Sequence, residues 1–185
     1  SVEEAAEIGR LGDVPVVLSH HKVTGSSNWG MTRDSLKRID QLAEGQSIHF
    51  DVYPYAASAT ALMPDRLSIA EKILIVASDK YPDKAGKYLK DIAISWDVTE
   101  LEAAEELLPA QAIYFAMDED DVQRVLKHER AMIGSDGIPG TNTPHPRLWG
   151  TFPRVLGHYS RRLDLFSLET AVYKMTGLTA QSFGF

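Results

Sequence analysis

VVLSHHKVTGSSNWG, residues 16–30, decides the fold class, because an apolar run ends there abruptly on polar side chains. Residues 14–18 have the short, β-branched pattern of a strand that is buried on both faces, as in parallel sheets. His20, His21 and Lys22 follow directly, although imidazole and ammonium groups are unfavourable to bury. This ending indicates either a metal site at the end of a strand or a polar loop.

Helix and strand patterns alternate on either side of this stretch. Strand patterns cover residues 14–18, 47–53, 111–117 and 131–134. Amphipathic helical patterns cover residues 2–10, 32–44, 119–128 and 168–176, the last of them stopped by Gly177. Residues 68–108 are predicted to be mostly helical, with a break at Tyr81–Pro82. The alternation predicts parallel strands joined by crossover helices, which is an α/β fold.

Polar side chains gather where these predicted strands end. His20 and Lys22 follow the first strand, Tyr53 ends the second, and Asp136 follows the last. Ligand sites in α/β sheets lie at the carboxyl ends of the strands. We therefore expect these side chains to share one site.

The residue types at these strand ends suit a metal site. Imidazole and carboxylate groups are the ligands expected for zinc and similar ions. Adjacent side chains of a strand point to opposite faces, so only one of His20 and His21 can face such a site. Asp136, within GSDG, could bind a metal or act as a general base. The alternatives are a solvated or capping histidine pair and a turn aspartate.

The stretch GTNTPHPRLWGTFPR, residues 140–154, is unusual for a plain linker, because prolines, arginines and bulky aromatic residues follow one another. A stiff loop that presents Arg147 after a strand end would suit the recognition of a carboxylate. The alternative is an ordered loop that Trp149 and Phe152 anchor in the protein core.

Composition narrows the classes of partner. The net charge is −7 and the arginines at 147, 154, 161 and 162 form no dense cluster, so we expect no nucleic acid partner. No apolar run is long enough to span a bilayer, and no signal sequence opens the chain, so we expect no membrane partner. Cysteine is absent, which is compatible with a cytoplasmic protein.

Five stretches of the chain resemble the D-aminoacylase family, the N-acyl-D-amino-acid deacylases of the amidohydrolase superfamily. They occur in the family's order and with its spacing, and they are SHHKVTGSSNWG, DVYPYAASAT, AIYFAMDEDDVQRVL, MIGSDGIP and HPRLWGTFPRVLGHYSRRLDLFSLETAVYKMTGLTAQSFGF. The resemblance implies a metal-dependent (β/α)8 barrel, of which residues 1–185 would be the C-terminal part with the last strands. It also implies that residues 57–110 form a mostly helical insertion that covers the active site.

The resemblance further implies hydrolysis of the N-acyl amide bond of small N-acyl-D-amino acids, with one or two zinc ions as cofactor. His20 would be a metal ligand, and Asp136 both a metal ligand and the catalytic proton carrier. Arg147, Lys22 and Tyr53 would bind the substrate carboxylate. Met117 would contact the substrate side chain.

The chain departs from the family pattern in two respects. The family's early His-x-His pair, a later cysteine and a further histidine have no counterpart here, so we expect an N-terminal part of the barrel as a missing partner. Ala59 stands where the family has a serine in the substrate pocket. Two other functions remain open: a non-catalytic truncated α/β module, and an amidohydrolase that acts on a cyclic amide such as a hydantoin or dihydroorotate.

Overall fold

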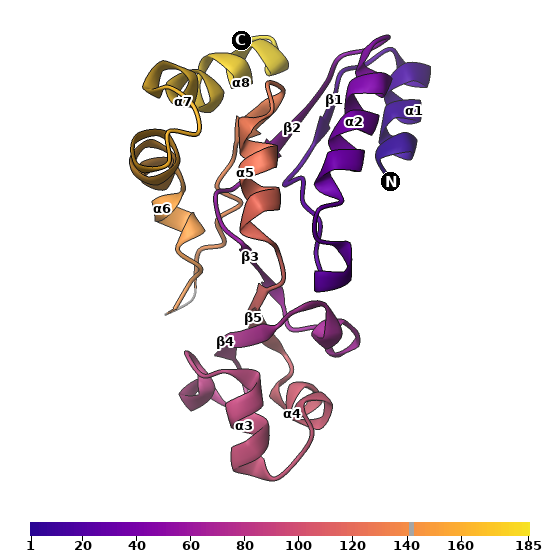
Figure 1. Cartoon of the computed structure of the whole chain (residues 1–185). Helices are drawn as coiled ribbons and strands as arrows, with labels where there is room; N and C mark the ends of the chain where they lie inside the picture. Colours follow the sequence, from indigo (N-terminus) through magenta and orange to yellow (C-terminus); the bar gives the residue numbers. More distant parts are fainter. Residues whose placement is uncertain (141–142) are drawn as a thin grey trace.

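Two sheets of different kinds organise the chain in the computed structural model, which describes residues 1–140 and 143–185 (Figure 1). One is parallel, with the strand order β1 (Val16–Leu18), β2 (Ile48–Val52) and β6 (Ala131–Ile133). The other is antiparallel, with the order β3 (Ala57–Ala61), β5 (Ala110–Phe115) and β4 (Lys72–Ser78). The predicted α/β class and the predicted parallel pairing are confirmed for the first sheet.

Helices cover one face of the parallel sheet. Those that contribute buried residues to this layer are α1 (Val2–Gly12), α2 (Thr32–Ala43), α5 (Glu119–Lys127) and α7 (Leu168–Met175). Ile48, Phe50 and Val52 of β2 point into this layer and are almost completely buried. The alternate residues His49 and Asp51 point to the opposite face, because successive side chains of a strand alternate. The sheet thus has an apolar, helix-covered face and a face that carries polar side chains.

The antiparallel sheet belongs to a unit that is inserted after β2. The chain enters the unit at Ala56 and leaves it at Met117, whose backbone N–H donates to the Ala56 carbonyl at 3.2 Å. Two helices, α3 (Leu89–Trp96) and α4 (Glu100–Leu107), cover this sheet below the parallel one in Figure 1. Short 3-10 turns, η2 (Pro64–Ile69) and η3 (Pro82–Lys84), connect its strands and helices.

The prediction of a mostly helical segment over residues 57–110 agrees with α3 and α4 but misses the strands β3 and β4 inside it. The run KILIVAS of β4 is rich in β-branched residues, which fit a pleated surface better than a helix. The strand predicted at 111–117 exists as β5, but it pairs antiparallel with β3 and β4 and does not join the parallel sheet.

The segment after β6 contains more helix than the sequence pattern indicates. Residues expected to form a loop carry α6 (Arg147–Arg154), followed by the π-helical turn η4 (Val155–Arg162). Pro153 lies inside α6 and has no N–H to donate, so the helix cannot continue with regular hydrogen bonds. Gly177 was expected to end the last helix, but it begins a further one, α8 (Gly177–Phe183). Thr141 and Asn142 lie outside the described residues.

The helices of this fold are short. The longest is α2 with 12 residues. Over residues 1–140 and 143–185, no helix combines the length and the apolar sequence that a bilayer-spanning helix needs.

A buried lysine joins α7 to the turn between α5 and β6. Lys174 is only 3% exposed, and its ammonium donates to the backbone carbonyls of His128 and Ala131. Burial lowers the pKa of Lys174 to about 8, although the nearby Glu129 carboxylate acts in the opposite direction. The charged form is therefore less stable in the folded chain than in water.

We expect this lysine to make stability depend on pH in the alkaline range. Between pH 8 and 10.5 the unfolded chain binds more protons at Lys174 than the folded chain, so its contribution to the unfolding free energy rises with pH. Across this pH range the unfolding free energy should rise by about 3 kcal/mol because of Lys174, and the Lys174→Met variant should lack this increase. Urea unfolding of both proteins across this pH range measures the difference, and a difference that does not change with pH would contradict the assignment.

Candidate functional site

A cavity of about 600 Å³ lies at the carboxyl ends of the parallel strands, between that sheet and the inserted unit. The parallel sheet and the segments that follow its strands contribute six of the residues singled out in the sequence, with His21 at the edge of the cavity: His20, His21, Lys22, Tyr53, Asp136 and Arg147. The inserted unit contributes small and medium-sized side chains, among them Ser58, Ala59, Thr60 and Met63. The structure therefore brings strand-end residues that are distant in sequence into one cavity.

Arg147 is the most buried charged side chain of this cavity, with 1% of its surface exposed. Its Nη1 lies 2.8 Å from Oδ2 of Asp136, and its Nη2 donates to the Ala59 carbonyl at 2.9 Å. The guanidinium carbon lies 4.7 Å from the centre of the Tyr53 ring. The Nε atom has no hydrogen-bond partner among the described residues. Arg147 therefore orients the Asp136 carboxylate and keeps one donor without a protein acceptor.

The backbone is strained at two of these positions. His20 has a φ of 44° and Asp136 a φ of 47°, in the left-handed region that residues other than glycine seldom adopt. Histidine and aspartate tolerate this region better than most residues, but it still requires support from the surrounding structure. Such strain is concentrated at functional sites. The chain turns sharply at each of these two positions, shortly after β1 and shortly after β6.

Asp51 supports the turn after β1, and the sequence analysis did not identify it. Its Oδ1 accepts from the backbone N–H of His20 at 2.8 Å, and its carbonyl accepts from the N–H of His21 at the same distance. A Cβ atom at Gly134 would lie 3.1 Å from that Oδ1, so glycine gives the carboxylate its space. The strand alternation at 47–53, which places Asp51 on the polar face, was the available signal.

Lys22 reaches back over this turn. Its Nζ lies 2.9 Å from Nδ1 of His20 and donates to the His20 carbonyl at 2.8 Å. It also lies 5.2 Å from the centre of the Tyr53 ring. Burial lowers the pKa of Lys22 to about 8, helped by Arg147 and opposed by the Asp136 and Asp51 carboxylates. Burial also raises the pKa of the Tyr53 hydroxyl, which therefore stays protonated at neutral pH.

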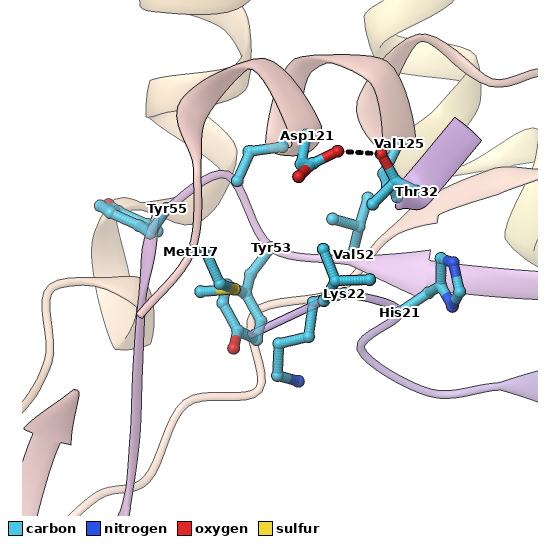
Figure 2. Close-up of a pocket in the computed structure, with 11 residues that line it drawn as sticks. His21, Lys22, Thr32, Val52, Tyr53, Tyr55, Met117, Asp121 and Val125 are labelled. Carbon is cyan, nitrogen blue, oxygen red and sulfur yellow. Dashed lines mark hydrogen bonds between the residues drawn. The ribbon is translucent and has the colours of Figure 1, made fainter. Parts of the chain in front are cut away.

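His21 points away from this group, as expected for the second histidine of the pair (Figure 2). Its Nε2 lies 2.9 Å from the Ser35 hydroxyl of α2, and its ring packs 5.3 Å from the Phe50 ring. Burial, followed by the charges of Lys22 and His128, lowers the pKa of His21 to about 4. His21 is therefore a neutral side chain that packs against the helix layer.

Met117 does not line the large cavity. It borders a space of only about 10 Å³ behind the site, where it packs beside Tyr53 and close to Lys22 (Figure 2). Tyr114 of β5 reaches the large cavity instead. The contact between Met117 and the side chain of a substrate stays a prediction.

The donor groups in the cavity fit part of a zinc site. His20 and Asp136 supply an imidazole and a carboxylate, which are ligand types that zinc prefers. Catalytic zinc normally has three protein ligands. The described residues contain no group of three or more histidine, aspartate or glutamate side chains placed to hold a metal ion. These residues could therefore supply two ligands of a zinc site and would need others to complete it.

Comparison with known proteins identifies relatives over the whole chain, although no family model matches it. The chain is 51% identical over 184 residues to the D-aminoacylase of Alcaligenes xylosoxydans xylosoxydans. That match covers 100% of this chain and 38% of the relative. The chain thus spans well under half the length of the curated protein it matches.

Solved structures agree with this match. A structure of D-aminoacylase, which defines a novel subset of amidohydrolases, superposes with a TM-score of 0.95 at 53% identity over 99% of this chain and 39% of its own. The N-acyl-D-glutamate deacylase of Bordetella bronchiseptica, complexed with zinc and a phosphonate mimic of the tetrahedral intermediate, has a TM-score of 0.96 at 48% identity. It is matched over 100% of this chain and 39% of its own.

The partly buried ion pair between Asp136 and Arg147 allows a stability prediction. Asp136→Asn removes the charge partner of Arg147 and should destabilise the chain by about 2–3 kcal/mol, somewhat less than for a fully buried pair. The double variant Asp136→Asn with Arg147→Met should recover part of this loss, because no unpaired charge remains buried. Urea unfolding of the wild type, both single variants and the double variant gives the coupling energy, and purely additive effects would contradict the pairing.

Proposed function

Because this chain is related along its full length to D-aminoacylases and N-acyl-D-amino-acid deacylases, we propose that it forms part of an enzyme that hydrolyses N-acyl-D-amino acids. The products are a free D-amino acid and the carboxylate of the acyl group. The observation that carries this proposal is the Asp136–Arg147 pair, which lies in one cavity with His20, Lys22 and Tyr53. That cavity combines a proton acceptor with cationic groups that suit an anionic substrate.

The parallel sheet suits a segment of a (β/α)8 barrel. Helices cover one face of β1, β2 and β6, while Val17, His49, Asp51 and Met132 lie on the other face and outside the core clusters. A barrel has this arrangement, because its helices form an outer ring around the strands. A doubly wound sheet instead carries helices on both faces. We assign the chain to the last strands of such a barrel, completed by other segments.

Arg147, Lys22 and Tyr53 bind the substrate carboxylate in this proposal. The ammonium of Lys22 is a donor at the cavity wall, and behind it Nε of Arg147 and the Tyr53 hydroxyl are buried polar atoms without a hydrogen-bond partner among the described residues. The Tyr53 ring lies within reach of both cations, at 5.2 Å from Nζ of Lys22 and 4.7 Å from the Arg147 guanidinium carbon. In this structure Nη1 and Nη2 of Arg147 are engaged by Asp136 and the Ala59 carbonyl, so Arg147 contributes mainly its positive charge to the carboxylate site.

Asp136 carries the proton. Its carboxylate accepts a proton from the water that attacks the acyl carbon and delivers it to the amine nitrogen as the C–N bond breaks. Arg147 holds Oδ2 of Asp136 at 2.8 Å and so fixes the orientation of the carboxylate. Zinc, held in part by His20 and Asp136, supplies Lewis acidity for this hydrolysis when it is bound.

A cyclic amide substrate is the second candidate function. The cations Lys22 and Arg147 suit a substrate with a free carboxylate, which an N-acyl-D-amino acid and dihydroorotate carry and a simple hydantoin lacks. Parallel assays with an N-acyl-D-amino acid, its L enantiomer, a hydantoin and dihydroorotate separate these candidates and the non-catalytic module. Hydrolysis of the D compound alone is the expected result.

We expect Arg147→Ala to impair binding of the carboxylate in whichever polypeptide carries this segment and shows deacylase activity. Loss of one charge-assisted contact, worth about 1.5–3 kcal/mol, should raise the KM for N-acetyl-D-methionine by roughly 10- to 100-fold. Steady-state kinetics measure this, with circular dichroism as the control for folding. An unchanged KM in a folded variant would exclude Arg147 from substrate binding.

Removal of the metal should abolish deacylation. Dialysis against a chelator removes zinc, and readdition of zinc should restore the rate in the wild type. In His20→Ala the zinc content at equal zinc concentration should fall, because an imidazole ligand is lost. Elemental analysis measures this directly, and full zinc content in His20→Ala would exclude His20 as a ligand.

A further inference from the structure

Asp121, in the first turn of α5, lies outside the cavity but is tied to the loop that enters it. We infer that Asp121 is a positioning residue, which fixes the loop of residues 19–31 and thereby places Lys22 for substrate binding. This inference rests on the proposed function, since it assigns Lys22 to the substrate carboxylate.

The Asp121 carboxylate is only 3% exposed, and all of its partners bind it as donors. One oxygen accepts from the Gly30 backbone N–H at 2.6 Å. The other accepts from the Thr32 hydroxyl (Figure 2). It also accepts from the Arg124 guanidinium. Burial alone would raise the pKa of Asp121, but these hydrogen bonds and the charge of Arg124 lower it. The carboxylate therefore stays charged while it holds the end of the loop.

A second anchor holds the middle of the same loop. The Ala116 carbonyl accepts from the Gly25 backbone N–H at 2.8 Å and from Nε1 of Trp29 at 3.2 Å. Ala116 lies just before Met117, at the exit of the inserted unit. The loop is thus attached at three of its residues to the segment that runs from the inserted unit into α5.

Packing transmits the position of this loop to Lys22. The space between the loop and α5 is lined by Lys22, Val52, Tyr53, Met117 and Val125, and only about 10 Å³ of it is free (Figure 2). Side chains around so full a space pack against one another, so a shift of the loop moves Lys22 relative to Tyr53. Release of the loop at Gly30 and Thr32 would therefore allow Lys22 to leave its place beside Tyr53.

The neighbouring Asp120 provides a matched control. It lies in the same first turn of α5, and both carboxylates interact favourably with the positive end of the helix. Asp120 is exposed, and its carboxylate has no hydrogen bond to the loop among the described residues. A difference between Asp121→Asn and Asp120→Asn therefore reports the loop contacts and not the charge of the helix terminus.

Kinetics of deacylation test the inference, with N-acetyl-D-methionine as the substrate and the active polypeptide that carries this segment. Asp121→Asn should raise the KM at least fivefold and leave kcat within about twofold, because the carboxylate contact is weakened and the proton carrier is untouched. Asp120→Asn should change neither constant. A lower kcat with an unchanged KM, or no change at all, would overturn the inference.

Hydrogen exchange separates this inference from the proposed function. Asp121→Asn should speed amide exchange in residues 19–31 at least tenfold, while Asp120→Asn should not. Faster exchange with an unchanged KM overturns the positioning role. If the wild type hydrolyses no N-acyl-D-amino acid, the proposed function fails, and the exchange result still decides whether Asp121 holds the loop.

Two substitutions at Thr32 keep the test decisive if Asp121→Asn does not fold. Thr32→Ser keeps the hydroxyl that donates to Asp121, and Thr32→Val removes it at similar volume. The serine variant should retain the wild-type KM and the wild-type rate of amide exchange in residues 19–31. The valine variant should show the raised KM and the faster exchange predicted for Asp121→Asn. Equal behaviour of the two variants would overturn the inference.

Discussion

The buried guanidinium of Arg147 is the interaction on which the arrangement of the cavity depends. Burial of a charge to 1% exposure is costly without an ion pair and hydrogen bonds, and the partners of the two Nη atoms of Arg147 come from two separate parts of the fold. Asp136 follows the last parallel strand, and the Ala59 carbonyl belongs to the inserted unit. The same side chain lies against the Tyr53 ring at the end of β2. One arginine therefore fixes the inserted unit and two strand ends relative to each other.

The spacing of apolar residues along the chain predicted those helices and strands whose formation depends on residues close in sequence. The strands β1, β2 and β6 and the helices α1, α2, α5 and α7 follow from apolar periodicity, because burial on one face selects residues at fixed spacing. The grouping of His20, Tyr53 and Asp136 followed from the general rule that parallel strands end at one edge. The resemblance to the D-aminoacylases was also reached from short motifs, and the match over the whole of this chain confirms that similarity.

Features that depend on distant partners could not be predicted in the same way. The strand β3 pairs with β5 across the whole inserted unit, and nothing in the ASATA sequence of β3 indicates a strand of that kind. Asp51 and Asp121 each look like an ordinary strand or helix carboxylate, and their donors, the N–H groups of His20 and Gly30, are distant in sequence. Met117 was placed in the cavity by resemblance, whereas packing places it behind Tyr53.

The hydrogen bond between Met117 and Ala56 has a consequence for how such a protein could diversify. The inserted unit leaves and rejoins the parallel framework at adjoining residues, so its length and composition can change without stretching the strands on either side. One wall of the cavity could then be exchanged by recombination or by engineering, while Asp136, Lys22 and their supports stay in place. This division would allow the wall of the cavity to change on an unchanged parallel framework.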